Sequence, residues 1–174
     1  YLNSANHTGR DGLVALDLDL KPVEPPIVGT WLDDSPDVHC HDSTVVSYAT
    51  GPYAGREIAF CFAENDGLKI VDVTDKSSMF TLSQVVYPNT RYSHQGWPTE
   101  DRRFLFINDE GDETSGAVSQ TTSYIVNIED LSYPYFLTSF SNGLCAVDHN
   151  EMVRGSFLFE ANYSTGLRVF SVCD

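Results

Sequence analysis

Short runs of branched and aromatic residues, each bounded by polar turn residues, recur along the whole chain. Such runs predict short, buried β-strands. No stretch shows the i, i+3, i+4 apolar spacing of an amphipathic helix, and turn residues interrupt the pattern every ~8–12 positions. Four of the runs match one another: Gly12–Leu18, Gly67–Val73, Ser123–Ile128 and Gly166–Val172. The pattern therefore predicts an all-β protein built from a repeated unit.

The matching runs return at a nearly fixed period. Leu13 and Leu68 are 55 residues apart, as are Leu68 and Ser123, and Ser123 and Leu167 are 44 apart. Four antiparallel strands in ~45–55 residues are typical of a β-propeller blade, whereas a β-sandwich has no such fixed period. The expected units are 1–36, 37–90, 91–143 and 144–174.

The strand pattern is incomplete at both ends. The first unit lacks its opening strand and the fourth lacks its closing strand, which leaves about three and a half blades of four-stranded antiparallel sheet. Propellers normally close with at least four blades, and unpaired strand edges promote aggregation. We therefore expect a partial propeller, completed by further chain segments or by another polypeptide.

A histidine followed by a small polar residue precedes or opens a strand in each of the last three units. The pairs are His41-Asp42, His94-Gln95 and His149-Asn150, spaced 53 and 55 residues apart. Equivalent positions on the inner strands of a propeller face one axis, so three imidazoles are expected to gather there.

Two interpretations of these histidines remain open. Neutral imidazole binds zinc, copper, iron or nickel, and the following Asp42, Gln95 and Asn150 could orient the rings. His39 lies two residues before His41 and would share its face of a strand, adding a further ligand. Alternatively, the repeated histidine bonds the backbone of the next blade and has a purely structural role.

The longest irregular stretch, 109–122, begins with the carboxylates Asp109, Glu110, Asp112 and Glu113. Oxygen ligands around a glycine suit calcium, although the spacing is not that of an EF-hand. The divalent cation expected for this chain is therefore calcium or a histidine-bound transition metal. The alternative is a solvated acidic loop.

The net charge of −15 disfavours nucleic acid and anionic membranes as partners. No apolar run approaches the roughly 20 residues of a membrane span. The cysteines Cys40, Cys61, Cys145 and Cys173 form no CxxC pair but allow two disulfides, within Cys40/Cys61 and within Cys145/Cys173. Two N-glycosylation sequons begin at Asn6 and Asn162. These features favour an extracellular protein, either secreted or surface-anchored.

Several segments resemble the LVIVD-repeat extracellular β-propellers, also called choice-of-anchor B proteins. The resemblance rests on motifs in the same order along 37–174, listed here: His41–Tyr48, Gly55–Phe60, Leu68–Lys76, Tyr87–Asn89, Ala146–Asn150 and Ala161–Val169. It implies a secreted or surface-anchored propeller longer than this chain, and it leaves the biochemical role undefined.

The function expected from the sequence is a binding or structural assembly module, with a protein or glycan partner. One alternative is a metal-dependent hydrolase or lyase with a His/carboxylate site at the propeller channel. Another is a repeating subunit of an extracellular filament, in which a neighbour supplies the missing strands.

Overall fold

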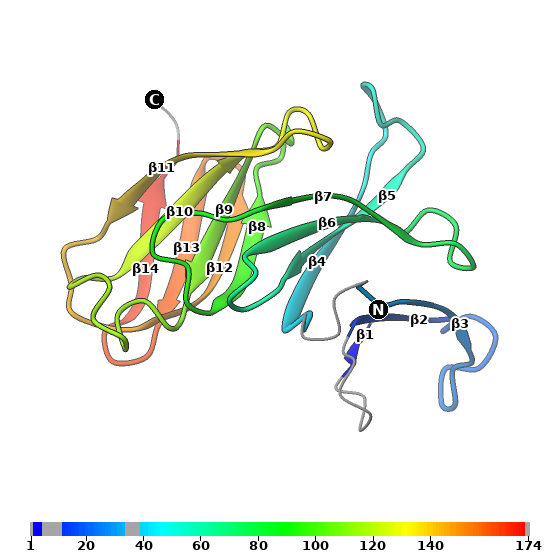
Figure 1. Ribbon diagram of the computed structural model, residues 1–174, viewed down its shortest axis with the longest axis horizontal. Helices are drawn as coiled ribbons and strands as arrows, with labels where there is room; N and C mark the ends of the chain where they lie inside the picture. Colours follow the sequence, from blue (N-terminus) through cyan, green and yellow to red (C-terminus); the bar gives the residue numbers. More distant parts are fainter. Residues whose placement is uncertain (1, 5–11, 34–38, 173–174) are drawn as a thin grey trace.

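The computed structural model describes residues 2–4, 12–33 and 39–172, and all fourteen regular elements in these ranges are β-strands. They form four antiparallel sheets (Figure 1). The first sheet contains β1 (Leu2–Ser4), β2 (Gly12–Leu16) and β3 (Ile27–Trp31). The second contains β4 (Asp42–Ser47), β5 (Glu57–Phe62), β6 (Leu68–Asp72) and β7 (Phe80–Val85). The third sheet contains β8 (Ser93–Pro98), β9 (Phe104–Asp109), β10 (Thr122–Asn127) and β11 (Tyr135–Ser141). The fourth contains β12 (Asp148–Arg154), β13 (Phe157–Asn162) and β14 (Gly166–Ser171).

Each sheet is a meander whose strands pair in chain order, and each falls within one repeat of the sequence. The two complete sheets, β4–β7 and β8–β11, have four strands, while β1–β3 and β12–β14 have three among the described residues. The matching runs of the sequence become β2, β6, β10 and β14, the third position of the blade pattern. No helix in the described ranges is long and apolar enough to cross a membrane.

The first strands of three successive sheets, β4, β8 and β12, lie next to one another. The Thr44 hydroxyl on β4 donates to the Gly96 carbonyl on β8 at 2.8 Å, and the Glu151 amide on β12 donates to Gln95 Oε1 on β8 at 2.7 Å. A Cβ at Gly96 would lie 2.2 Å from the Phe106 carbonyl oxygen and would also strike the Phe62 ring of the neighbouring sheet. The absence of a side chain at Gly96 therefore permits this close approach.

Apolar side chains fill the spaces between adjacent sheets. Phe60 and Ile70 of one sheet meet Leu105, Ile107 and Tyr124 of the next in the largest cluster. A smaller cluster joins β12–β14 to β8–β11, and another joins β1–β3 to β4–β7. Face-to-face burial explains why alternate residues of these strands are apolar on the sides that meet.

The cysteines divide into one bridge and one free thiol. Cys40 and Cys61 form the expected disulfide, with Cα atoms 5.4 Å apart, which ties the entry of β4 to β5. Cys145 has a free and exposed thiol. Its expected partner, Cys173, lies outside the described residues.

Candidate metal centre

The three repeated histidines come together at the converging first strands. His41 immediately precedes β4, His94 lies on β8 and His149 lies on β12. The His94 ring lies between the other two, with its centroid 4.6 Å from that of His41 and 4.3 Å from that of His149. The repeat in the sequence thus becomes a row of imidazoles in space.

The buried His94 has a defined tautomer. Its Nδ1 lies 2.7 Å from the carbonyl oxygen of His149. A carbonyl can only accept, so Nδ1 carries the proton and, in the neutral ring, Nε2 keeps its lone pair. Burial is the main effect that lowers the pKa of His94, and the neighbouring His41 and His149 lower it further, against the opposing effect of Glu110. His94 is therefore neutral near pH 7, in the form that binds metals.

Glu110, which follows β9, faces both His94 and His149. Glu110 Oε2 is 3.6 Å from His94 Nε2, and Oε1 is 4.0 Å from His149 Nε2. Ligand atoms of these three residues lie within 4.8 Å of one another, the one such His/Cys/Asp/Glu group among the described residues. Tetrahedral zinc places ligand atoms roughly 3.3 Å apart, so small side-chain movements would close the set around an ion.

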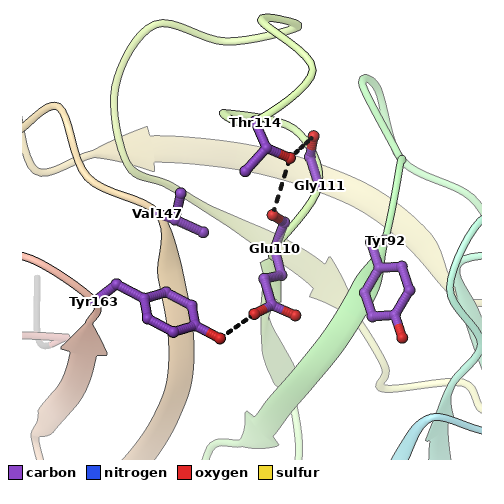
Figure 2. A pocket seen from close by; sticks show the side chains of 6 residues that line it. All are labelled: Tyr92, Glu110, Gly111, Thr114, Val147 and Tyr163. Atoms are coloured by element: carbon purple, nitrogen blue, oxygen red, sulfur yellow. Dashed lines mark hydrogen bonds between the residues drawn. The ribbon is translucent and has the colours of Figure 1, made fainter.

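Two tyrosines flank this group. The Tyr163 hydroxyl donates to Glu110 Oε1, and this bond to a carboxylate raises the pKa of Tyr163. The Tyr92 hydroxyl lies 2.9 Å from His41 Nδ1. Figure 2 shows Tyr92 and Tyr163 on either side of Glu110, where they line a pocket of about 390 Å³ together with Val147. A small molecule in this pocket would lie beside the Glu110 carboxylate.

Asp109 fixes the turn that presents Glu110. Its Oδ2 accepts from the Tyr87 hydroxyl at 3.0 Å and the Arg91 amide at 2.8 Å, and its Oδ1 accepts from the amides of Tyr92 at 2.7 Å and Gly111 at 3.1 Å. The residue is fully buried. The sequence prediction of a calcium ligand is corrected here, because both oxygens are already saturated by protein donors.

Asp112 and Glu113 turn away from the histidines. Asp112 Oδ2 accepts from the Tyr124 hydroxyl at 2.6 Å, and Glu113 Oε1 accepts from the Thr122 amide at 3.1 Å. Burial, as the largest cause, raises the pKa of Asp112 to about 6 and that of Glu113 to about 8. The four acids expected to form one calcium loop are thus divided among three environments, and only Glu110 reaches the histidines.

The polar residues that follow the histidines do not share one role. Gln95 Oε1 accepts a hydrogen bond from the Glu151 amide and so joins β8 to β12, and Gln95 Nε2 donates to the Gly96 carbonyl. Gln95 therefore does not orient His94, whose ring is held by the His149 carbonyl. Asp42 Oδ1 accepts from the amide of Ser43 at 2.6 Å.

The two remaining residues of the expected site are Asn150 and His39. Asn150 lies on β12 opposite Ala161. His39 precedes β4 and is not a member of the group formed by His94, Glu110 and His149.

The structure describes one of the two asparagines that the sequons mark as glycosylation sites. Asn162 ends β13 with only 7% of its surface exposed, and its Nδ2 donates to Glu160 Oε1 at 2.8 Å. Because this nitrogen is buried and already donates a hydrogen bond, we expect no glycan on Asn162 once the protein has folded. Asn6 lies outside the described residues.

Sequence reasoning missed the tyrosines of the site. Neither Tyr92 nor Tyr163 belongs to the His-polar pairs or the acidic stretch that the sequence pattern singles out. Tyr92 is two residues before His94, the separation at which strand residues share a face, and this was the available signal. Tyr163 meets Glu110 across 53 positions, which no local pattern reveals.

Comparison with known proteins gives a fold but no family. No protein-family profile matches the chain, and neither does any curated protein. The chain is similar in structure to a chain of hydrazine synthase from Kuenenia stuttgartiensis, with a TM-score of 0.57 and 14% sequence identity. The match covers 98% of this chain and 54% of the other, so the chain spans about half the length of that protein. This likeness supports a β-propeller-like arrangement of the four sheets.

Proposed function

We propose that this chain is a binding module of an extracellular β-propeller that holds a divalent transition metal through His94, His149 and Glu110. One observation carries the proposal: the bond from His94 Nδ1–H to the His149 carbonyl leaves a buried, neutral Nε2 directed at the Glu110 carboxylate. Two imidazoles and a carboxylate are a frequent set for zinc and for iron(II). Tyr163 orients the carboxylate as an outer partner.

The extracellular location rests on the Cys40–Cys61 disulfide, since reducing compartments disfavour such bridges. We also propose that the chain is related to the LVIVD-repeat propellers it resembles, and that it forms about three and a half blades of a larger propeller.

The outer face of β12–β14 exposes Met152, Leu167 and Val169. In the other sheets the corresponding apolar side chains pack against a neighbouring sheet, so we infer a further β-sheet as the partner of this face.

A second candidate function is metal-dependent hydrolysis. Three protein ligands leave a fourth position of a tetrahedral ion open, and the pocket of about 390 Å³ adjoins Glu110. A metal-bound water at that position would be acidified and could attack a substrate held between Tyr92 and Tyr163. A zinc-dependent turnover of p-nitrophenyl ester or phosphoester probes that disappears in His149→Ala would support this function. Zinc binding without any turnover would reject it.

The binding proposal is tested by metal analysis and calorimetry. The purified chain, stripped with a chelator, is titrated with Zn²⁺ and compared with His149→Ala, whose side chain is 40% exposed and can be removed with little cost to the fold. We expect one bound ion and at least a hundredfold weaker binding in His149→Ala. The matched control is His39→Ala, which we expect to bind as the wild type does. Equal affinity in the wild type and His149→Ala would refute the site.

A further inference from the structure

A second group of oxygen ligands, made of residues other than the histidines and Glu110, is buried between the sheets β8–β11 and β12–β14. On one side is the cross-strand pair Asn108 and Ser123. On the other are two cross-strand pairs, Asp148 with Asn162 and Glu151 with Glu160. All six residues are buried. They form a continuous polar layer within an otherwise apolar contact between sheets.

Hydrogen bonds cross this layer from one sheet to the other. Asn108 Nδ2 donates to Asp148 Oδ2 at 2.8 Å, and the Ser123 hydroxyl donates to Glu160 Oε2 at 3.0 Å. Asn162 Nδ2 donates to Glu160 Oε1 at 2.8 Å. Each amide group of the layer therefore uses its nitrogen on a carboxylate.

Five other oxygens of the same layer lack donors within the described ranges. Among the described residues, no hydrogen-bond partner is present for Asn108 Oδ1, Asp148 Oδ1, Asn162 Oδ1 or either carboxylate oxygen of Glu151. Asn108 is fully buried, Asn162 is 7% exposed and Glu151 is 3% exposed. Buried acceptors without partners cost free energy, so their concentration at one place is unusual for a folded protein.

These buried carboxylates form no salt bridge with any described residue, although Arg168 of β14 is paired opposite Glu160; the Arg168 guanidinium donates to the Leu167 carbonyl instead. Within the part of the chain that the structure describes, no ion pair joins Asp148, Glu151 or Glu160 to a lysine, arginine or histidine. Glu151 and Glu160 are directly opposite each other, an arrangement that destabilises a sheet when both are charged. A buried carboxylate is tolerated when it is paired with a cation.

We propose that this layer binds a hard divalent cation of the calcium class, with Asp148, Glu151 and the amide oxygens of Asn108 and Asn162 as ligands. Carboxylate and amide oxygens without nitrogen or sulfur ligands are the set that Ca²⁺ prefers, and its irregular coordination of 6–8 oxygens suits groups from two sheets. The Asn108–Asp148 hydrogen bond and the cross-strand pairs place these residues in one buried layer between the two sheets. The ion would fasten β12–β14 to β8–β11.

The test uses the full chain, stripped of metal and titrated with Ca²⁺ by calorimetry, with thermal unfolding measured in EDTA and in 5 mM Ca²⁺. We expect a dissociation constant below about 1 mM and a higher melting temperature in Ca²⁺. The neutral, nearly isosteric variants Asp148→Asn and Glu151→Gln should each weaken Ca²⁺ binding at least tenfold. In EDTA they should melt at or above the wild-type temperature, because each removes a buried charge.

Asp19→Asn, at an exposed position, is the matched control and should respond to Ca²⁺ as the wild type does. His149→Ala should keep the Ca²⁺ response while losing the Zn²⁺ response, which separates this site from the histidine centre. The proposal is overturned if 5 mM Ca²⁺ leaves the melting temperature unchanged, the result expected when protons alone neutralise these carboxyl groups. It is also overturned if Asp148→Asn and Glu151→Gln both bind Ca²⁺ like the wild type.

Discussion

The clearest stability prediction concerns Asp109→Asn. The wild-type carboxylate accepts four hydrogen bonds, two on each oxygen, while fully buried. An asparagine replaces one oxygen with an NH₂ group, and either orientation directs that group at two donors. Two hydrogen bonds are therefore lost, because the new NH₂ group and two of the original donors point at one another. The other two hydrogen bonds remain but are weakened, because their acceptor no longer carries a negative charge.

The magnitude follows from this count. A hydrogen bond to a charged group contributes about 1.5–3 kcal/mol, so losing two of them costs about 3–5 kcal/mol of unfolding free energy after partial relaxation. For a chain of this size, 1 kcal/mol lowers the melting temperature by roughly 2–4 °C, which gives a decrease of roughly 6–20 °C. Tyr87→Phe removes a single donor to the same carboxylate and should cost about 1.5–3 kcal/mol.

Circular dichroism in the absence of added metal measures both variants, with urea unfolding for the free energy and thermal unfolding for the melting temperature. The exposed Asp19→Asn serves as the control for loss of one negative charge and should differ little from the wild type. A melting temperature for Asp109→Asn within 2 °C of the wild type would refute the assignment of Asp109 as the clamp of this turn. A loss of stability that appeared only in Ca²⁺ would instead restore Asp109 as a calcium ligand.

Three further predictions concern the site and its surroundings. Tyr163→Phe removes the donor to Glu110 and should weaken Zn²⁺ binding about 10-fold, measured by calorimetry, with an unchanged melting temperature because Tyr163 is exposed. Folding raises the pKa of Glu113 from 4.5 to about 8, so between these pH values the folded state binds more protons than the unfolded state, and the free energy of unfolding falls as pH rises from 5 to 8. In urea unfolding at several pH values, Glu113→Gln should make this fall less steep, and an unchanged pH dependence would contradict the prediction. After secretion from eukaryotic cells, peptide mass spectrometry should find Asn162 without a glycan, and full occupancy would show that the site is exposed during or after folding.

Much of the fold was predictable because it depends on local sequence patterns. Alternating apolar residues and turn residues indicate the strand period, the boundaries between sheets and the Gly-Leu runs that become β2, β6 and β14. The Cys40–Cys61 bridge was also predictable, since Cys40 directly precedes β4 and Cys61 lies on the neighbouring β5. The recurrence of His41, His94 and His149 could be read in the same way, because equivalent positions of a repeat occupy equivalent places in space.

The candidate site was only partly predictable. Glu110 and Asp109 are neighbours in the sequence with the same chemistry, yet one faces the histidines and the other closes a buried turn. Asn162 satisfies a sequon, but the pleat of β13 turns it inward. Which of two adjacent side chains is buried depends on the sheet packed against it, and this information is not local.

The sequence by itself determined an acidic all-β chain with a repeated unit and three equivalent histidines. The tertiary structure alone decided that His94 donates to a backbone carbonyl and keeps the Nε2 lone pair, and that Glu110 is the acid beside it. It also decided that Asp148 and Glu151 are buried with carboxylate oxygens that have no hydrogen-bond partner among the described residues. The physical reason is distance along the chain. Strand patterns depend on residues two apart, whereas these contacts join residues from different segments of the chain, and that of His94 with His149 joins two sheets, whose meeting is set by packing.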